Sequence, residues 1–93
     1  MSEVIDALTK TILERQANPA AGSYTASLFA AGLPRMAQKV GEEGVETAIA
    51  ALAEGEDRLV YEMADLVYHC LVLLAAKGRS WADVEAELAR RFK

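Results

Sequence analysis

The segment between residues 57 and 77 constrains the fold of this chain more than any other part of it. On a helix that turns about 100° per residue, its side chains are apolar on nearly every side. Glu62, Asp65 and His69 nevertheless fall within an arc of roughly 60° on that helix. Because a helix that is apolar all round is buried, we expect these three polar groups to be buried with it, at least in part.

Apolar periodicity predicts helices along the rest of the chain as well, separated by short breaks at glycine and proline. The expected helices cover residues 2–16, 24–31, 34–53 and 57–77, and a last helix follows Ser80. Asp83 stands three residues after Ser80, in the spacing of a capping box. No stretch alternates as a half-buried strand does. We therefore expect one domain, residues 1–93, with an all-α fold of four to five antiparallel helices.

The helix expected at 57–77 also predicts how the chain assembles. It is apolar on most of its circumference, and only four other short helices exist to cover it. We expect dimerisation to complete the bundle, as a homodimer, because an uncovered apolar face is buried by a partner chain.

Gly41 and Gly44 each cost the 34–53 helix about 1 kcal/mol relative to Ala, which indicates that something approaches its backbone closely.

A second acidic group lies on the helix expected at 34–53. Glu42, Glu43 and Glu46 occupy one face of it, and the opposite half is apolar. Lys39 lies among the acids, so this pattern by itself is typical of a solvated face stabilised by a Lys39–Glu43 pair. The acids of the apolar helix favour a functional site instead, because buried carboxylates are costly unless they are paired or bind a metal.

The two acidic groups together hold five acids, for which Arg35 and Lys39 are the obvious basic partners. Two cations cannot neutralise five carboxylates, so we expect a divalent metal ion among them. Carboxylate oxygens suit Mg²⁺ and also Mn²⁺. Since Mg²⁺ completes its coordination with water and substrate phosphates, the pattern predicts a metal–phosphate site more than a structural metal cage.

Two further features each leave two interpretations open. Ser23, Tyr24 and Thr25 begin a helix, where they either cap it or bind an anion together with free amide groups. His69 is either a core residue satisfied by one hydrogen bond or a contact to the substrate one turn beyond Asp65.

Composition argues against several classes of protein. The formal net charge of -4 is unlike that of a general nucleic-acid binder. The longest nearly uncharged run, residues 66–76, has eleven residues, whereas a bilayer span needs about 20. The one cysteine excludes an internal disulfide, and the start of the chain lacks the pattern of a signal peptide. We therefore expect a cytoplasmic protein without nucleic-acid or membrane partners.

Three segments taken together resemble phosphoribosyl-ATP pyrophosphohydrolase: Ser23-Tyr24-Thr25, residues 38–47 (QKVGEEGVET) and residues 64–69 (ADLVYH). Residues 78–84 are similar to the start of that family's last helix, and the resemblance runs from residue 23 to residue 91. The wider superfamily, the all-α nucleoside triphosphate pyrophosphohydrolases, has two acidic residues, two spacers and a Glu, followed later by Glu-x-x-Asp. Both halves of that pattern are present.

The resemblance implies a role for each of these residues. The metal ligands would be Glu43, Glu46, Glu62 and Asp65. Either Glu42 or Glu46 would act as general base. The substrate-binding set, to which we add Arg35 as a second cation, would be Ser23, Tyr24, Thr25, Arg35, Lys39 and His69.

The reaction implied by the resemblance is the hydrolysis of phosphoribosyl-ATP to phosphoribosyl-AMP and pyrophosphate. This is the second step of histidine biosynthesis, with Mg²⁺ as cofactor or Mn²⁺ in its place. Two rivals stay open: a pyrophosphohydrolase that removes non-canonical nucleoside triphosphates, and a non-enzymatic helical interaction module with a charged groove. The acidic motif does not separate the first rival from the family, but the Ser-Tyr-Thr segment favours the histidine pathway.

Overall fold

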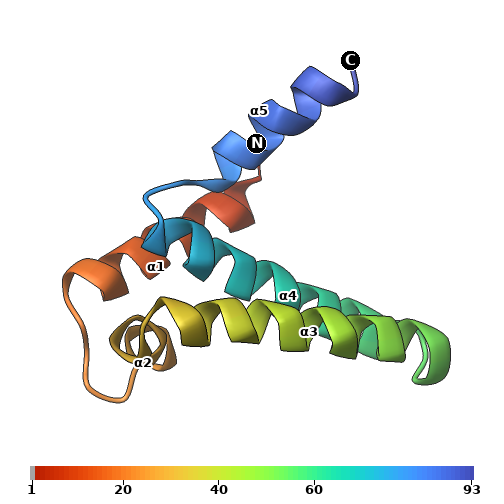
Figure 1. Ribbon diagram of the computed structural model, residues 1–93, viewed down its shortest axis with the longest axis horizontal. Coiled ribbons are helices and arrows are strands. Elements are labelled where there is room, and N and C mark those ends of the chain that lie inside the picture. Colours follow the sequence, from red (N-terminus) through yellow and green to blue (C-terminus); the bar gives the residue numbers. More distant parts are fainter. Residues whose placement is uncertain (1) are drawn as a thin grey trace.

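The computed structural model describes residues 2–93, and every regular element in that range is an α-helix (Figure 1). The helices are α1 (Glu3–Ala17), α2 (Tyr24–Ala31), α3 (Leu33–Ala53), α4 (Glu56–Ala76) and α5 (Trp81–Arg91). The expected all-α class is confirmed, with five helices and no strand among residues 2–93. That these helices form an antiparallel bundle completed by a second chain stays a prediction.

The helix ends follow local hydrogen bonds and fall within one residue of the expected bounds. Ser2 precedes α1 rather than beginning it, because its Oγ accepts a hydrogen bond from Ile5 N–H at 3.2 Å. At the start of α5, Ser80 N–H donates to Asp83 Oδ2 at 2.9 Å, as the expected capping box requires.

α3 and α4 form a long hairpin and lie side by side along their length (Figure 1). The chain turns back at Gly55, whose φ of 93° is a left-handed conformation that residues with a side chain rarely adopt. This turn places the middle of α3 opposite the middle of α4. The acidic residues of both helices lie in that middle section, so the hairpin turn is what brings them together.

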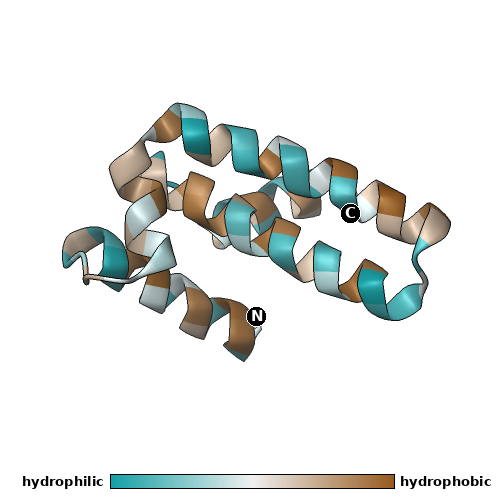
Figure 2. Ribbon diagram, turned by 90° about the horizontal axis from the view of Figure 1, so that it is seen from below, coloured by the Kyte–Doolittle hydropathy of each residue, from teal (hydrophilic) through white to brown (hydrophobic). Residues whose placement is uncertain are grey.

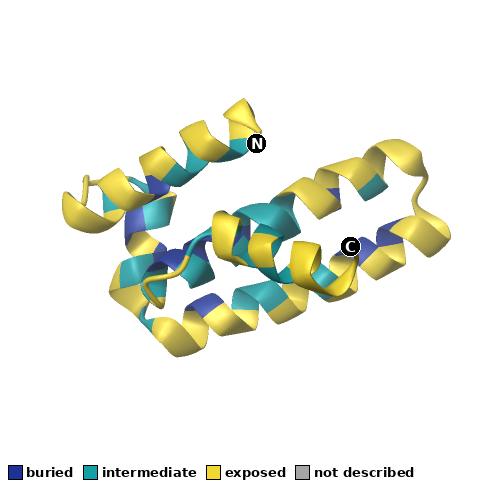
Figure 3. Cartoon of the chain, turned by 90° about the horizontal axis from the view of Figure 1, so that it is seen from above, coloured by how far each residue is buried: buried dark blue, intermediate teal, exposed yellow. Residues whose placement is uncertain are grey.

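Most of the hydrophobic core lies at the end of the hairpin away from its turn. Its buried members are Ile12, Leu28, Met36, Leu71, Val72 and Ala75. α1 and α2 pack across this end, whereas the other end of the hairpin extends beyond them (Figure 1). Along the hairpin, the facing sides of α3 and α4 are buried and their outer sides are exposed (Figure 3).

Several large apolar side chains of α3 are exposed, and they alternate along the helix with hydrophilic residues (Figure 2). Val45, Ile49 and Leu52 are 61%, 49% and 89% exposed. Gly41 and Gly44 are equally open, because no other atom lies within 4 Å of the point where a Cβ would stand. The expected close approach to this backbone is therefore absent within residues 2–93.

The expectation that α4 is buried is confirmed for its polar arc and for the apolar residues of its second half, and it is wrong for most apolar residues of its first half. Glu62 and His69 are buried, with 5% and 3% exposure, whereas Val60 and Met63 remain 68% and 45% exposed. The cause is a shortage of helices. α1 and α2 cover the far end of the hairpin, and α5 points away from it (Figure 1).

α4 is also the one helix in the described range that is long and apolar enough to cross a membrane, judged by length and composition alone. The core helix of a soluble protein passes the same test, so this is weak support for a membrane span. α4 packs against α3 and holds two buried ionisable side chains, which is the arrangement of a core helix.

Two neighbouring residues of α1 test the position of the core. Ile12 is 1% exposed and Leu13 is 47% exposed. We expect Ile12→Ala to lower the free energy of unfolding by about 2–5 kcal/mol, because buried methyl groups are lost and a cavity remains. Leu13→Ala, the matched control, should change it by less than about 1 kcal/mol. Urea unfolding followed by circular dichroism measures both, and equal losses would contradict this core.

Candidate metal centre

Four carboxylates meet between α3 and α4: Glu43, Glu46, Glu62 and Asp65. One oxygen from each lies within 4.8 Å of the others. The spacing of three residues puts each pair on one side of its own helix, and the hairpin turns those two sides toward each other. The four residues expected as metal ligands are therefore brought together.

Glu43 is the most deeply placed of the four. It is 3% exposed, and its Oε1 lies 3.2 Å from Lys39 Nζ. Burial opposes ionisation, but hydrogen bonding to Lys39 and to neighbouring acids outweighs it, so the pKa of Glu43 is lowered. Its other oxygen, Oε2, is buried without any hydrogen-bond partner. Glu43 thus offers a charged oxygen that no group in the described chain satisfies.

Mutual repulsion marks the rest of the cluster. Hydrogen bonding to Glu43 and Glu62, together with their charges, raises the pKa of Glu46 to about 7. Burial and the neighbouring Glu43 raise the pKa of Asp65. Both shifts report too little positive charge among the carboxylates. An all-oxygen, anionic donor set with one unsatisfied buried atom fits a hard divalent cation such as Mg²⁺ or Mn²⁺.

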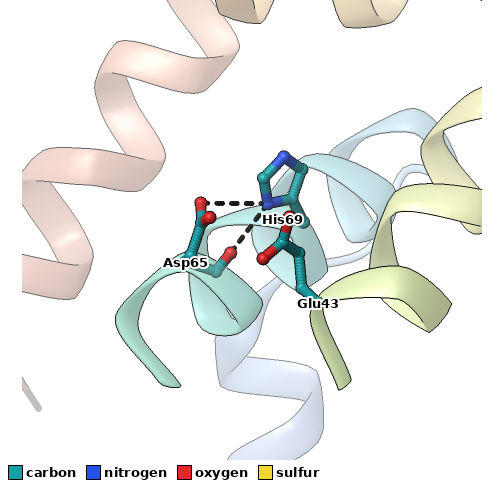
Figure 4. Close-up of side chains that lie close together, drawn as sticks. All are labelled: Glu43, Asp65 and His69. Carbon is teal, nitrogen blue, oxygen red and sulfur yellow. Dashed lines mark hydrogen bonds and ion pairs between the residues drawn. The ribbon is translucent and has the colours of Figure 1, made fainter. Parts of the chain in front are cut away.

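His69 lies one turn beyond Asp65 on α4 and is 3% exposed (Figure 4). Its Nδ1 is 2.7 Å from the backbone oxygen of Asp65 and 3.4 Å from Asp65 Oδ1. Its Nε2 is 3.0 Å from the hydroxyl of Tyr24. Of the two interpretations left open by the sequence, the geometry matches the satisfied core histidine, with two hydrogen bonds in place of one.

The first turn of α2 reaches α4 next to these acids. Ser23 caps α2, since its Oγ accepts a hydrogen bond from Ala26 N–H at 3.1 Å. The hydroxyls of Thr25 and Tyr68 share a hydrogen bond of 2.5 Å. Tyr24 is 52% exposed although its hydroxyl is bonded to His69. Of the six residues expected to bind substrate, the three in this segment are thus one helix cap and two side chains that are hydrogen-bonded to α4.

Glu42 and Arg35 lie outside the carboxylate cluster. Gln38 Nε2 donates to Glu42 Oε2 at 2.9 Å, and Lys39 Nζ lies 3.6 Å from Glu42 Oε1. Arg35 Nη1 is 3.8 Å from the same oxygen. Burial opposes the charge of Lys39, but its hydrogen bond to Glu43 and the surrounding charges raise the pKa of the ammonium. Of the two base candidates, only Glu46 is a member of the cluster.

Arg58 is a site residue that the sequence reasoning missed. It lines a hollow of about 440 Å³ beside the cluster, together with Glu46, Ile49, Glu54, Tyr61, Glu62 and Asp65. Its guanidinium lies 4.4 Å from the centre of the Tyr61 ring, and its Nη2 donates to Glu62 Oε1 at 3.4 Å. The sequence spacing could have identified it, because Arg58 precedes Glu62 by four residues and therefore lies on the same side of α4.

Comparison with known proteins extends the resemblance over nearly the whole chain. Residues 5–92 match the family model described as phosphoribosyl-ATP pyrophosphohydrolase. A phosphoribosyl-ATP pyrophosphatase of Pyrobaculum calidifontis is 59% identical over 92 residues, which cover 97% of this chain and 96% of the relative. The phosphoribosyl-ATP pyrophosphatase of Saccharolobus solfataricus is 49% identical over 92 residues, which cover 99% of this chain and 98% of the relative. The phosphoribosyl-ATP pyrophosphatase of Novosphingobium aromaticivorans is 54% identical over 89 residues, which cover 96% of this chain and 83% of the relative.

The raised pKa of Glu46 gives a pH dependence with a defined sign. The folded protein holds this proton up to about pH 7, whereas the ordinary glutamate pKa of 4.5 applies once the chain unfolds. In the presence of a chelator, the melting temperature of the wild type should therefore fall relative to Glu46→Gln as the pH rises from 5 to 8. Adding Mg²⁺ at pH 8 should raise the melting temperature of the wild type more than that of Glu46→Gln.

Glu3→Gln on the exposed surface of α1 is the control for this experiment, because it makes the same chemical change outside the cluster. Its melting temperature should follow the wild type at every pH. Parallel curves for wild type and Glu46→Gln would show that the cluster does not raise this pKa.

Proposed function

Because the chain belongs to the phosphoribosyl-ATP pyrophosphohydrolase family, we propose that it hydrolyses phosphoribosyl-ATP to phosphoribosyl-AMP and pyrophosphate. This is the second step of histidine biosynthesis. The observation that carries the proposal is the carboxylate cluster between α3 and α4, in which Glu43 Oε2 is buried and unpaired. A polyphosphate-cleaving site needs such an arrangement to hold a cation beside a highly charged substrate.

Glu43, Glu46, Glu62 and Asp65 would hold Mg²⁺, or Mn²⁺ in its place. A bound ion of this kind supplies charge neutralisation for the phosphates and orients water for attack. The protein contributes the placement of the ligands. Glu43 is fixed in its charged form by Lys39, and Glu62 is buried and paired with Arg58 on its own helix, α4.

Cations near the cluster would receive the phosphates. Lys39 and Arg35 lie on the first half of α3, and both form ion pairs with Glu42. A substrate phosphate could replace Glu42 as their partner. Their charge offsets phosphate groups that the metal does not reach. Ser23, Tyr24 and Thr25 at the start of α2 would line the other side of the substrate, with His69 behind them.

Glu46 is the stronger candidate for the general base. It is exposed, belongs to the cluster, and has a pKa near neutrality before a metal binds. Glu46 would accept a proton from the attacking water while the water oxygen bonds to phosphorus. The bond between that phosphorus and the bridging oxygen then breaks, and pyrophosphate leaves. Glu42 is held by Gln38, Lys39 and Arg35 on the outer rim.

The uncovered apolar side of α3 supports a homodimer. The side chains that face α4 include Glu43 and Thr47, whereas Val45 and Leu52 point outward. A second chain would cover this surface and complete an antiparallel helix bundle, and the open backbone at Gly41 lets another helix approach closely. We place this enzyme in the cytoplasm, with a nucleotide as its substrate and without nucleic-acid or membrane partners.

Asp65→Asn separates catalysis from stability. We expect the metal-free variant to be as stable as the wild type or slightly more stable, because one of several repelling carboxylates is removed. The neutral amide oxygen is a weaker ligand, so Mg²⁺ should raise its melting temperature less. Release of pyrophosphate from phosphoribosyl-ATP should fall by about 100-fold or more.

Three controls accompany this assay. ATP replaces phosphoribosyl-ATP to test substrate choice, a chelator removes the divalent ion, and Asp6→Asn makes the same change on exposed α1. Turnover that survives thorough chelation would remove the metal from the proposal. A destabilised but fully active Asp65→Asn protein would remove Asp65 from the site.

Sedimentation equilibrium tests the assembly. At micromolar concentration we expect twice the 10.0 kDa mass of the chain. Val45→Glu should shift the protein toward the monomer, because it buries a charge in the expected interface. Ala20→Glu in the loop before α2 is the control and should leave the dimer intact. A folded wild-type monomer under these conditions would exclude the dimer.

A further inference from the structure

His69 has no ring nitrogen left for a substrate. The backbone oxygen of Asp65 can only accept a hydrogen bond, so Nδ1 of His69, 2.7 Å away, carries the proton and donates it. In the neutral ring Nε2 then has only a lone pair, which accepts the hydroxyl proton of Tyr24 at 3.0 Å. With 3% exposure, the ring is covered as well as satisfied.

Tyr24 is the exposed end of this chain of contacts. Its ring is 52% exposed, its edge-to-face contact with His69 spans 5.9 Å between centroids, and the Tyr68 ring lies 6.2 Å away. The next residue, Thr25, bonds to Tyr68 at 2.5 Å. Two consecutive residues of α2 are thus bonded to two consecutive residues of α4, so the Tyr24 ring is fixed beside the carboxylate cluster.

We propose that His69 is a positioning residue that acts through Tyr24, and that the Tyr24 ring packs against the nucleoside part of the substrate. This inference rests on the function proposed above. The hydroxyl proton of Tyr24 is donated to His69, so Tyr24 offers a ligand its exposed ring and no further donor. A flat, uncharged ring suits the flat base or the ribose of a nucleotide, whereas phosphates are served by cations.

Two substitutions at His69 separate its two hydrogen bonds. The amide of Gln reaches the position of Nε2, and the amide of Asn reaches the position of Nδ1. His69→Gln therefore keeps a partner for Tyr24, and His69→Asn keeps the bond to the Asp65 backbone. The remaining variants are Tyr24→Phe and the double variant Tyr24→Phe/His69→Asn, each checked for helical content and melting temperature.

We expect His69→Asn and Tyr24→Phe to raise KM for phosphoribosyl-ATP by about fivefold to tenfold, the effect of one lost hydrogen bond, with kcat changed less than about threefold. His69→Gln should stay closer to the wild type. The double variant should be no worse than Tyr24→Phe alone, since both changes break the same bond. Inhibition by phosphoribosyl-AMP should weaken in parallel, and inhibition by pyrophosphate should be unchanged.

Several results would overturn the inference. If the increases in KM of the two single variants multiply in the double variant, His69 does not act through Tyr24. A fall in kcat at unchanged KM, or weaker pyrophosphate inhibition, would place His69 at the reacting phosphates. If His69→Gln and His69→Asn raise KM equally, the hydrogen bond to Tyr24 does not account for the effect of His69 on KM. A wild-type protein that releases no pyrophosphate would instead refute the proposed function itself.

Discussion

The ion pair between Lys39 and Glu43 is the contact on which the site depends. It keeps a carboxylate charged at 3% exposure, at a depth where an unpaired acid would be protonated. Lys39 and Arg58 pair with Glu43 and Glu62, but two cations do not neutralise four carboxylates, and the pKa values of Glu46 and Asp65 are raised as a result. The protein alone therefore leaves its central cleft short of positive charge, which is the condition under which a divalent cation binds tightly.

The same arrangement explains the unusual distribution of polarity along the hairpin. α3 turns its acids toward α4, so its apolar residues are left on the outer side, where Leu52 is 89% exposed. In a single chain this is unfavourable, because apolar surface stays in water while charges are buried. A second chain on the outer side of α3 would remove that cost. The proposed metal site inside the hairpin and the proposed dimer interface outside it would thus both follow from the rotation of α3.

In the proposed site, α2 would connect the carboxylate cluster to the nucleoside part of the substrate. It is the shortest helix that contacts the hairpin, and Tyr24 and Thr25 bond it to His69 and Tyr68. α4 thus carries two of the proposed metal ligands in its first half and the supports of α2 one turn later. The proposed phosphate site and the proposed nucleoside contact would both depend on this one helix.

The sequence by itself determined the five helices, their caps and the grouping of acids, because helical periodicity and capping are local. It placed Glu43 and Glu46 on one face of α3, and Glu62 and Asp65 on one face of α4. Periodicity does not say how a helix is rotated against its neighbour. Only the tertiary structure decided that Glu46 joins the cluster while Glu42 stays on the rim, that His69 bonds to Tyr24, and that the apolar side of α3 faces outward. Those outcomes depend on contacts between residues far apart in the chain, where the pairing of charges competes with the burial of apolar surface.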